Sequence, residues 1–432
     1  MTTTGVLTPK LSEDTPRHWI FAPFGQWFVE IGWWLWAIFA AVIAIRTGLH
    51  PEKNSVSECY RIACACWWSG RSMYENVYED KFNDIYNGFI YLPHAAIVYS
   101  PFYILPPWLG ESLNRVAVIA MMAWAVWRVT KMASTRSWND SFFVVSAITI
   151  GVGAGNAVNG QYNLPVAASL VLAACALVEK RWWWGAIWLA VAVLFKPIAI
   201  APVLLAIALY PALWWRFPVV ALVAFAMPFV TCVYGPAYAW GEYEMFWTKV
   251  VRATQPLPRR FAEFSTVLWW FVSDLTNFQR NICRAVAAVV TLGLGFVALR
   301  RHGELRGGLI LWALGVSYIV IFNPRTEGLT YVVVAPAIAL FGAMEFAAAR
   351  TPIWRRAAGI TLLAMGFLMI FVHELMPRSG AYFEVAQGSK DLLARPIMSM
   401  LFYLWLTWLT LVDRREAAPV PILFNPTVQS SP

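Results

Sequence analysis

Residues 27–45, WFVEIGWWLWAIFAAVIAI, form a long apolar segment in which Glu30 is the one charged residue. An α-helix needs about 17–25 consecutive apolar residues to cross the hydrocarbon core of a bilayer. Apolar segments of this length recur along the whole chain. We therefore predict an all-α polytopic membrane protein and not a β-barrel.

The composition points the same way. Apolar residues make up 59% of the chain and charged residues 13%, against about 45–50% and 25% in a soluble domain. A formal net charge of +9 would suggest nucleic-acid binding in a soluble protein. Here the basic residues form short clusters between apolar segments, which is typical of membrane topology. We expect no nucleic-acid partner.

The polar stretch 49–88 follows the first apolar segment and is the most highly charged part of the chain. Its acidic residues are Glu52, Glu58, Glu75, Glu79, Asp80 and Asp84, and its basic residues are Lys53, Arg61, Arg71 and Lys81. Within it, SECYRIACACWWS (57–69) is mostly apolar and compatible with a helix, but too short to span a bilayer. We predict an interfacial helix there, in a first external loop that covers residues 47–111.

The next apolar segment, FIYLPHAAIVYSPFYILPP (89–107), is broken by four prolines. Because proline interrupts helices, we expect this segment to dip into the membrane and return, with a full crossing as the alternative. Further spans are predicted at about 112–130, 140–158, 162–179, 182–196, 197–214, 217–235, 281–299, 308–323, 328–348, 356–375 and 396–412.

The basic clusters set the predicted orientation. Placing all of them in the cytosol, as the positive-inside rule favours, gives about 12 spans with cytosolic tails at 1–26 and 415–432 around a membrane domain at 27–414. A second long external loop is then expected at 236–280. The turns GQYN (160–163), Lys196-Pro197 and NPRTE (323–327) fall on the same external side as the first loop.

These external turns hold candidate ligand-binding groups. Lys196 interrupts two apolar segments, so it is either a cation for a lipid phosphate or a lysine that reaches the membrane surface. Arg325 is either a second phosphate-binding group or the partner of Glu327 in a local ion pair. Gln161 and Asn163 suit sugar hydroxyls, although Gly and Asn are also common turn residues.

Glu58 is the first choice for a catalytic carboxylate, with Asp80 and Asp84 as reserves. Transfer of a sugar from a phosphate-linked donor needs one base to accept the proton of the acceptor hydroxyl. The phosphate already leaves readily, so a second carboxylate is not required, in contrast to glycoside hydrolysis. Because the histidines are scattered, we infer no metal site.

In this order, the motifs resemble those of glycosyltransferase family 87. They are Glu58, Tyr60 and Ala63; Gly70 and Tyr74; Tyr91 and Pro93; Ser100 and Pro101; GQYN (160–163); Lys196-Pro197; and NPRTEGLTY (323–331). The resemblance implies a GT-C-type bundle of transmembrane helices, a catalytic carboxylate in the first external loop and a polyprenyl-phosphate donor. The chain departs from the family in having Glu58 where Asp is usual and Tyr91-Leu92-Pro93 where Tyr-Pro-Pro is usual.

We therefore expect an inverting transfer of a hexose, such as mannose, to a lipid or glycan acceptor. It would occur at the external face of the plasma (inner) membrane, in a monomer that uses no cofactor. Glu58 would be the base and Lys196 and Arg325 would hold the donor phosphate. The predicted substrate-binding residues are Gln161, Asn163, Tyr91, Glu327 and Tyr331. The alternative is a lipid or solute transporter, but the chain shows no internal repeat of the kind common in that class.

Overall fold

The computed structural model describes residues 25–51, 56–74, 89–133, 138–253, 261–271, 275–347, 352–375 and 391–413. Throughout these ranges the regular elements are helices, without a strand, which confirms the all-α prediction. They are α1 (Gly25–Leu49), α2 (Ser57–Ser69), α3 (Pro93–Tyr103), α4 (Pro107–Ala133), α5 (Trp138–Asn159), α6 (Asn163–Val178), α7 (Trp182–Phe195), η2 (Pro197–Ala199), α8 (Ile200–Leu209), η3 (Pro211–Leu213), α9 (Arg216–Thr231), α10 (Pro236–Ala253), α11 (Phe264–Phe271), α12 (Asn277–Phe322), η4 (Gly328–Val333), α13 (Ala335–Ala347), α14 (Ile353–Leu375) and α15 (Asp391–Leu411).

Six helical segments of the described chain are long and apolar enough to cross a membrane. They lie in α1, α4, α5, η3–α9, α12 and α14, and four shorter apolar helical segments lie in α6, α7, η2–α8 and α13. The short helices α6 and α13 are buried at nearly every position, so they form the centre of the bundle. The polytopic membrane prediction is confirmed, and the number of crossings stays a prediction.

The long helix α12 is an antiparallel pair that reverses at Gly303. The backbone there has φ 71° and ψ −175°, a conformation that is essentially open to glycine alone. On either side of the reversal, Gly307 lies against Ala298, and Arg284 Nε donates to the carbonyl oxygen of Phe322 at 2.9 Å. The two spans predicted at 281–299 and 308–323 therefore correspond to the two arms of α12.

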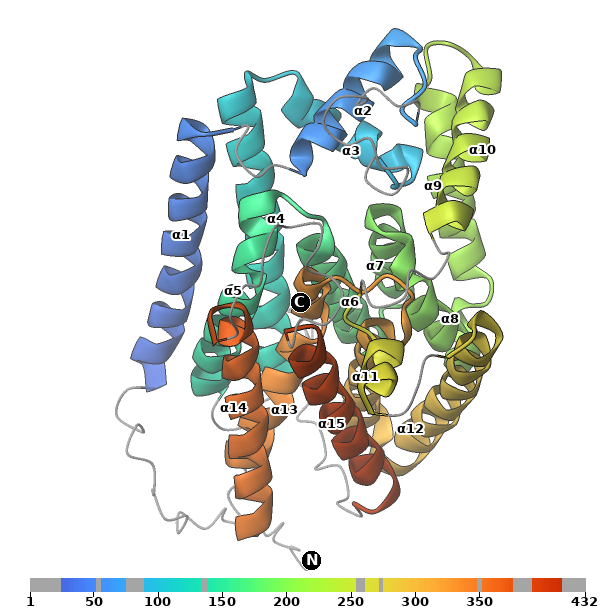
Figure 1. Ribbon diagram of the computed structural model, residues 1–432. Coiled ribbons are helices and arrows are strands. Elements are labelled where there is room, and N and C mark those ends of the chain that lie inside the picture. The colour runs from blue at the N-terminus through green and yellow to red at the C-terminus, as the bar shows by residue number, and fades with distance from the viewer. Residues whose placement is uncertain are drawn as a thin grey trace, which may run out of the picture.

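Helices α2 and α3 cap one end of the bundle, at the top of Figure 1. The predicted helix at 57–69 is confirmed as α2. Helix α3 has 11 residues, a length of about 16 Å, so it cannot cross a core of about 30 Å. The predicted loop at 236–280 is largely helical, because it contains α10, α11 and the start of α12.

Ion pairs gather the basic turns of the chain at one end. They join Arg128 to Glu179, Lys180 to Glu304, Arg306 to Glu345 and Asp413, and Arg355 to Glu345 and Asp413. These residues lie in or beside the turns between α4 and α5, α6 and α7, the arms of α12, and α13 and α14, together with the end of α15. The described basic residues of these turns thus share one end, as the predicted orientation requires, and the polar turns lie at the other ends of the same helices.

Candidate active site

Four of the predicted site residues form one chain of hydrogen bonds. Lys196 Nζ donates to Asn163 Oδ1 at 2.9 Å, and Asn163 Nδ2 donates to Gln161 Oε1 at 2.9 Å. Gln161 Nε2 then donates to Glu327 Oε2 at 3.5 Å. Three turns that lie far apart in the sequence are therefore brought together at one place.

The local sequence explains why Lys196 lies at a helix break. Pro197 disfavours the helical conformation for the residue before it, and Lys196 has an extended backbone with φ −156° and ψ 121°. Helix α7 consequently ends at Phe195, and η2 begins at Pro197. The break lets the lysine leave the apolar helix surface and reach the polar turn that holds Asn163.

A cavity of about 560 Å³ opens beside this chain of hydrogen bonds. Its volume is within the usual range of small-molecule sites, about 300–1,000 Å³. Polar side chains at the cavity are Tyr91, Lys196, Arg284, Tyr318, Asn323, Arg325 and Glu327. Most of the remaining wall is apolar, including Val193, Ile198, Phe246, Trp247, Val250 and Phe322. The cavity thus combines a cationic part with an extended apolar wall.

Among the described residues, three cations and one carboxylate, Glu327, line the cavity. Lys196 and Arg325 were predicted, and the Arg325 guanidinium lies 5.7 Å from the centre of the Phe261 ring. Arg284 is the third. The sequence placed it inside a predicted span, where an ionisable residue is itself a signal of function, so this residue could have been found from the sequence.

Arg284 is held at the cavity by a buried acid. Its Nη2 lies 3.5 Å from a carboxylate oxygen of Glu263, and its Nη1 donates to Asn281 Oδ1 at 3.1 Å. Burial raises the pKa of the Glu263 carboxyl, while a hydrogen bond from Ser265 and the charge of Arg284 act in the opposite direction. The pair fixes the guanidinium while the cavity keeps an excess of positive charge, which suits an anionic group.

Tyr331 has a structural role and is not among the described residues that line the cavity. It is fully buried, and its hydroxyl donates to the carbonyl oxygen of Ala262 at 2.8 Å. The backbone N–H of Ala262 donates to the carbonyl oxygen of Thr326 at 2.9 Å. Tyr331 therefore holds the segment before α11 against the NPRTE turn. Gln161 and Asn163 are connected to Lys196 by hydrogen bonds, and they are not among the described cavity-lining residues.

Glu58 lies in the first turn of α2 and is partly exposed. It is not among the described residues that line the cavity, but its helix packs against the site. The Tyr60 ring stacks on Tyr162 of the GQYN turn, with centroids 4.1 Å apart, and lies 4.9 Å from the cavity residue Tyr91. The reserves Asp80 and Asp84 lie outside the described residues.

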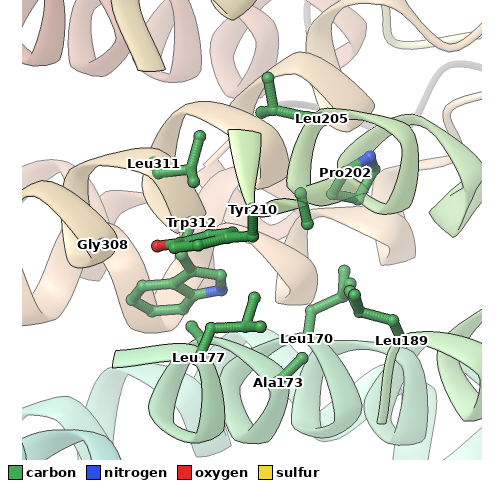
Figure 2. Close-up of a pocket in the computed structure, with 12 residues that line it drawn as sticks. Leu170, Ala173, Leu177, Leu189, Pro202, Leu205, Tyr210, Gly308, Leu311 and Trp312 are labelled. Carbon is green, nitrogen blue, oxygen red and sulfur yellow. The ribbon is translucent and has the colours of Figure 1, made fainter. Parts of the chain in front are cut away.

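A second, smaller cavity lies between α6, α7, α8 and the second arm of α12. Figure 2 shows its lining of leucines around Tyr210 and Trp312. Its volume is about 40 Å³, and none of its described lining residues is charged. It offers no cation for phosphate binding among these residues, whereas Lys196 and Arg325 line the larger cavity. The larger cavity is therefore the candidate active site.

Comparison with known proteins identifies the family of the chain. The model of glycosyltransferase family 87 matches residues 89–324, which is more than half of the chain. No curated protein matches the sequence. The matched range contains Tyr91, Lys196 and Arg284 and ends just before Arg325. The chain therefore belongs to glycosyltransferase family 87, and it is a membrane glycosyltransferase.

Proposed function

We propose that the protein transfers a hexose, such as mannose, from a polyprenyl-phosphate donor to a lipid or glycan acceptor at the external face of the plasma membrane. The observation that carries this proposal is the cavity, which has three cations and a long apolar wall. A sugar linked to a lipid phosphate needs both features, because its phosphate is anionic and its chain is a hydrocarbon.

The donor phosphate would lie against Lys196, Arg284 and Arg325. Its isoprenoid chain would follow the apolar wall, where Phe246 and Trp247 of α10 provide the largest side chains. A nucleotide-linked sugar has no hydrocarbon chain to cover such a wall. Tyr91 and Glu327, which also line the cavity, would contact the hydroxyls of the sugar.

The reaction proposed here is a single displacement. The acceptor hydroxyl oxygen attacks the anomeric carbon, Glu58 accepts the hydroxyl proton, and the bond between that carbon and the phosphate oxygen breaks. The bonding electron pair leaves with the phosphate, whose negative charge grows from one towards two. Cations at this position therefore stabilise the transition state more than the bound donor, which is the condition for catalysis. Attack from the opposite face inverts the anomeric configuration.

The proposed external location rests on charge distribution. The basic turns and their ion pairs occupy the end of the bundle opposite to the polar turns of the site. Cytoplasmic segments of membrane proteins are enriched in Lys and Arg. The end that carries Glu58, Lys196 and Arg325 would then face outwards.

The test is sugar transfer by the purified protein with radiolabelled polyprenyl-phosphate-mannose and a membrane-lipid extract as the acceptor. UDP- and GDP-linked sugars serve as donor controls. We expect labelled product from the lipid donor alone, and a loss of turnover of about 100- to 10,000-fold in Glu58→Gln, which is the usual contribution of general base catalysis.

The exposed Glu244 on α10, whose carboxylate accepts a hydrogen bond from Trp240, supplies a matched control. Glu244→Gln should transfer sugar at the wild-type rate. Transfer from a nucleotide sugar, or none from any lipid-linked hexose by folded protein, would contradict the proposed donor. Wild-type turnover in Glu58→Gln would remove Glu58 as the base.

A further inference from the structure

A buried polar network joins the first turn of α2 to α3 and α4. Glu111 of α4 accepts hydrogen bonds from Ser57 Oγ on one carboxylate oxygen and from the hydroxyl of Tyr99 on the other. Arg115, one turn further along α4, forms an ion pair with the same carboxylate at 2.6 Å. Ser57, Glu111 and Arg115 are each at most 3% exposed.

The same network extends to the turn at the end of α5. Arg115 Nη2 donates to Ser57 Oγ at 3.1 Å, and Arg115 Nε donates to the carbonyl oxygen of Ala157 at 3.1 Å. Gly160 has φ +66°, and a Cβ placed there would lie 3.0 Å from Ser57 and from Arg115. The GQYN turn is therefore packed directly onto Ser57 and Arg115, and a larger residue than glycine would be strained there.

A buried ion pair is an expensive way to join helices. Desolvation of the two charges offsets much of their attraction, and apolar side chains of similar size often give equal stability. A buried carboxylate–guanidinium pair does, however, fix the distance and orientation of the two side chains, because its hydrogen bonds have a specific geometry. Such a network is suited to fixing the position of the helix turn that it contacts, which here is the first turn of α2.

We infer that Ser57, Glu111 and Arg115 are positioning residues that fix the α2 turn carrying Glu58 against the GQYN turn of the active site. This inference rests on the proposed function, because it takes Glu58 as the base. None of the three residues is among the described residues that line the large cavity. They act through the backbone of α2, since Ser57 is the direct neighbour of Glu58.

Ser57→Ala is the most informative variant. It removes one hydroxyl and leaves Glu111 with its bonds from Arg115 and Tyr99. We expect kcat to fall on the order of 10- to 100-fold, the effect of small displacements of a catalytic group. The donor KM should stay unchanged, because the phosphate-binding cations are untouched.

Tyr99→Phe removes a hydrogen bond to the same carboxylate from α3 instead of α2. Its kcat should fall less than that of Ser57→Ala, because the bond between Ser57 and Glu111 remains. Glu345→Gln, in the buried ion cluster at the opposite end of the bundle, controls for a general loss of stability. A wild-type kcat in Ser57→Ala would overturn the inference, as would an equal fall in all three variants that follows their melting temperatures.

Amide hydrogen exchange tests the contact at α2 without relying on sugar-transfer activity. The first turn of α2 should exchange faster in Ser57→Ala than in the wild type, with α13 to α15 unchanged. If the wild-type protein transfers no sugar, the proposed function fails, and faster exchange confined to this turn would still support the positioning contact. Unchanged exchange at α2 would refute it.

Discussion

Replacing Lys196 by methionine tests the phosphate-binding assignment most directly. Methionine keeps most of the volume of the aliphatic part of the lysine side chain and removes its charge. The ammonium has a neutral partner, Asn163 Oδ1 at 2.9 Å, so its charge is available to an anion in the cavity. A hydrogen bond to a charged group contributes about 1.5–3 kcal/mol, and about 1.4 kcal/mol corresponds to a tenfold rate. We expect kcat/KM for the lipid-linked donor to fall about 10- to 100-fold.

The melting temperature should change little in Lys196→Met. The variant loses the hydrogen bond from the ammonium to Asn163, but it also loses the cost of taking that charge out of water, and the two effects oppose each other. Lys180→Met is the control: this exposed lysine pairs with exposed Glu304 at the opposite end, and such surface pairs contribute little. The assay is initial-rate transfer over a range of donor concentrations. A kcat/KM in Lys196→Met within twofold of the wild type, or an equal fall in Lys180→Met, would refute the reasoning.

Three further predictions concern other parts of the chain. Arg284→Gln should raise the donor KM about tenfold or more, measured in the same assay, because the cavity loses its third cation. Gly303→Ala should lower stability by about 1–3 kcal/mol in thermal unfolding, since φ is +71° there, whereas Gly293→Ala, in the open helical part of α12, should not. Although burial opposes it, two arginines lower the pKa of Asp413, so its carboxylate stabilises the fold above about pH 4 and loses this effect as the pH falls through the lower folded pKa. Melting curves against pH should show that loss in the wild type and not in Asp413→Asn.

Hydropathy and proline placement were sufficient to predict most of the fold. The α2 helix at 57–69, the reversal between the arms of α12 and the break at Lys196-Pro197 all follow from local chemistry. What could not be fully predicted is which helices are short. Helix α8 ends at Leu209 because Pro211 follows the extended Tyr210, which is a local signal. Helix α13, however, begins only after η4, where Asn156 and Arg395 of other helices bind the carbonyl groups of Leu329 and Gly328, and such distant partners are not visible in a hydropathy pattern.

Some residues of the candidate site could be predicted from the sequence and others could not. The polar turns were visible because each interrupts an apolar segment, and the structure joins Lys196, Gln161 and Glu327 through hydrogen bonds. Tyr331 was assigned to the substrate on resemblance, but its hydroxyl is taken by a backbone carbonyl. Arg115 escaped notice because its partner, Glu111, is one helical turn away, and such a pair looks like any exposed ion pair until burial is known.

The site and the helix breaks depend on the same side chains. Each break leaves carbonyl groups without helical partners, and side chains satisfy several of them: Asn156 Nδ2 donates to the carbonyl oxygen of Leu329 at 2.8 Å, and Arg395 Nη1 to that of Gly328 at 2.7 Å. Asn156 Oδ1 also accepts a hydrogen bond from Asn163, which holds Lys196. Loss of Asn163 should therefore reduce stability and turnover together, whereas loss of Lys196 should reduce turnover alone, because only the lysine faces the cavity.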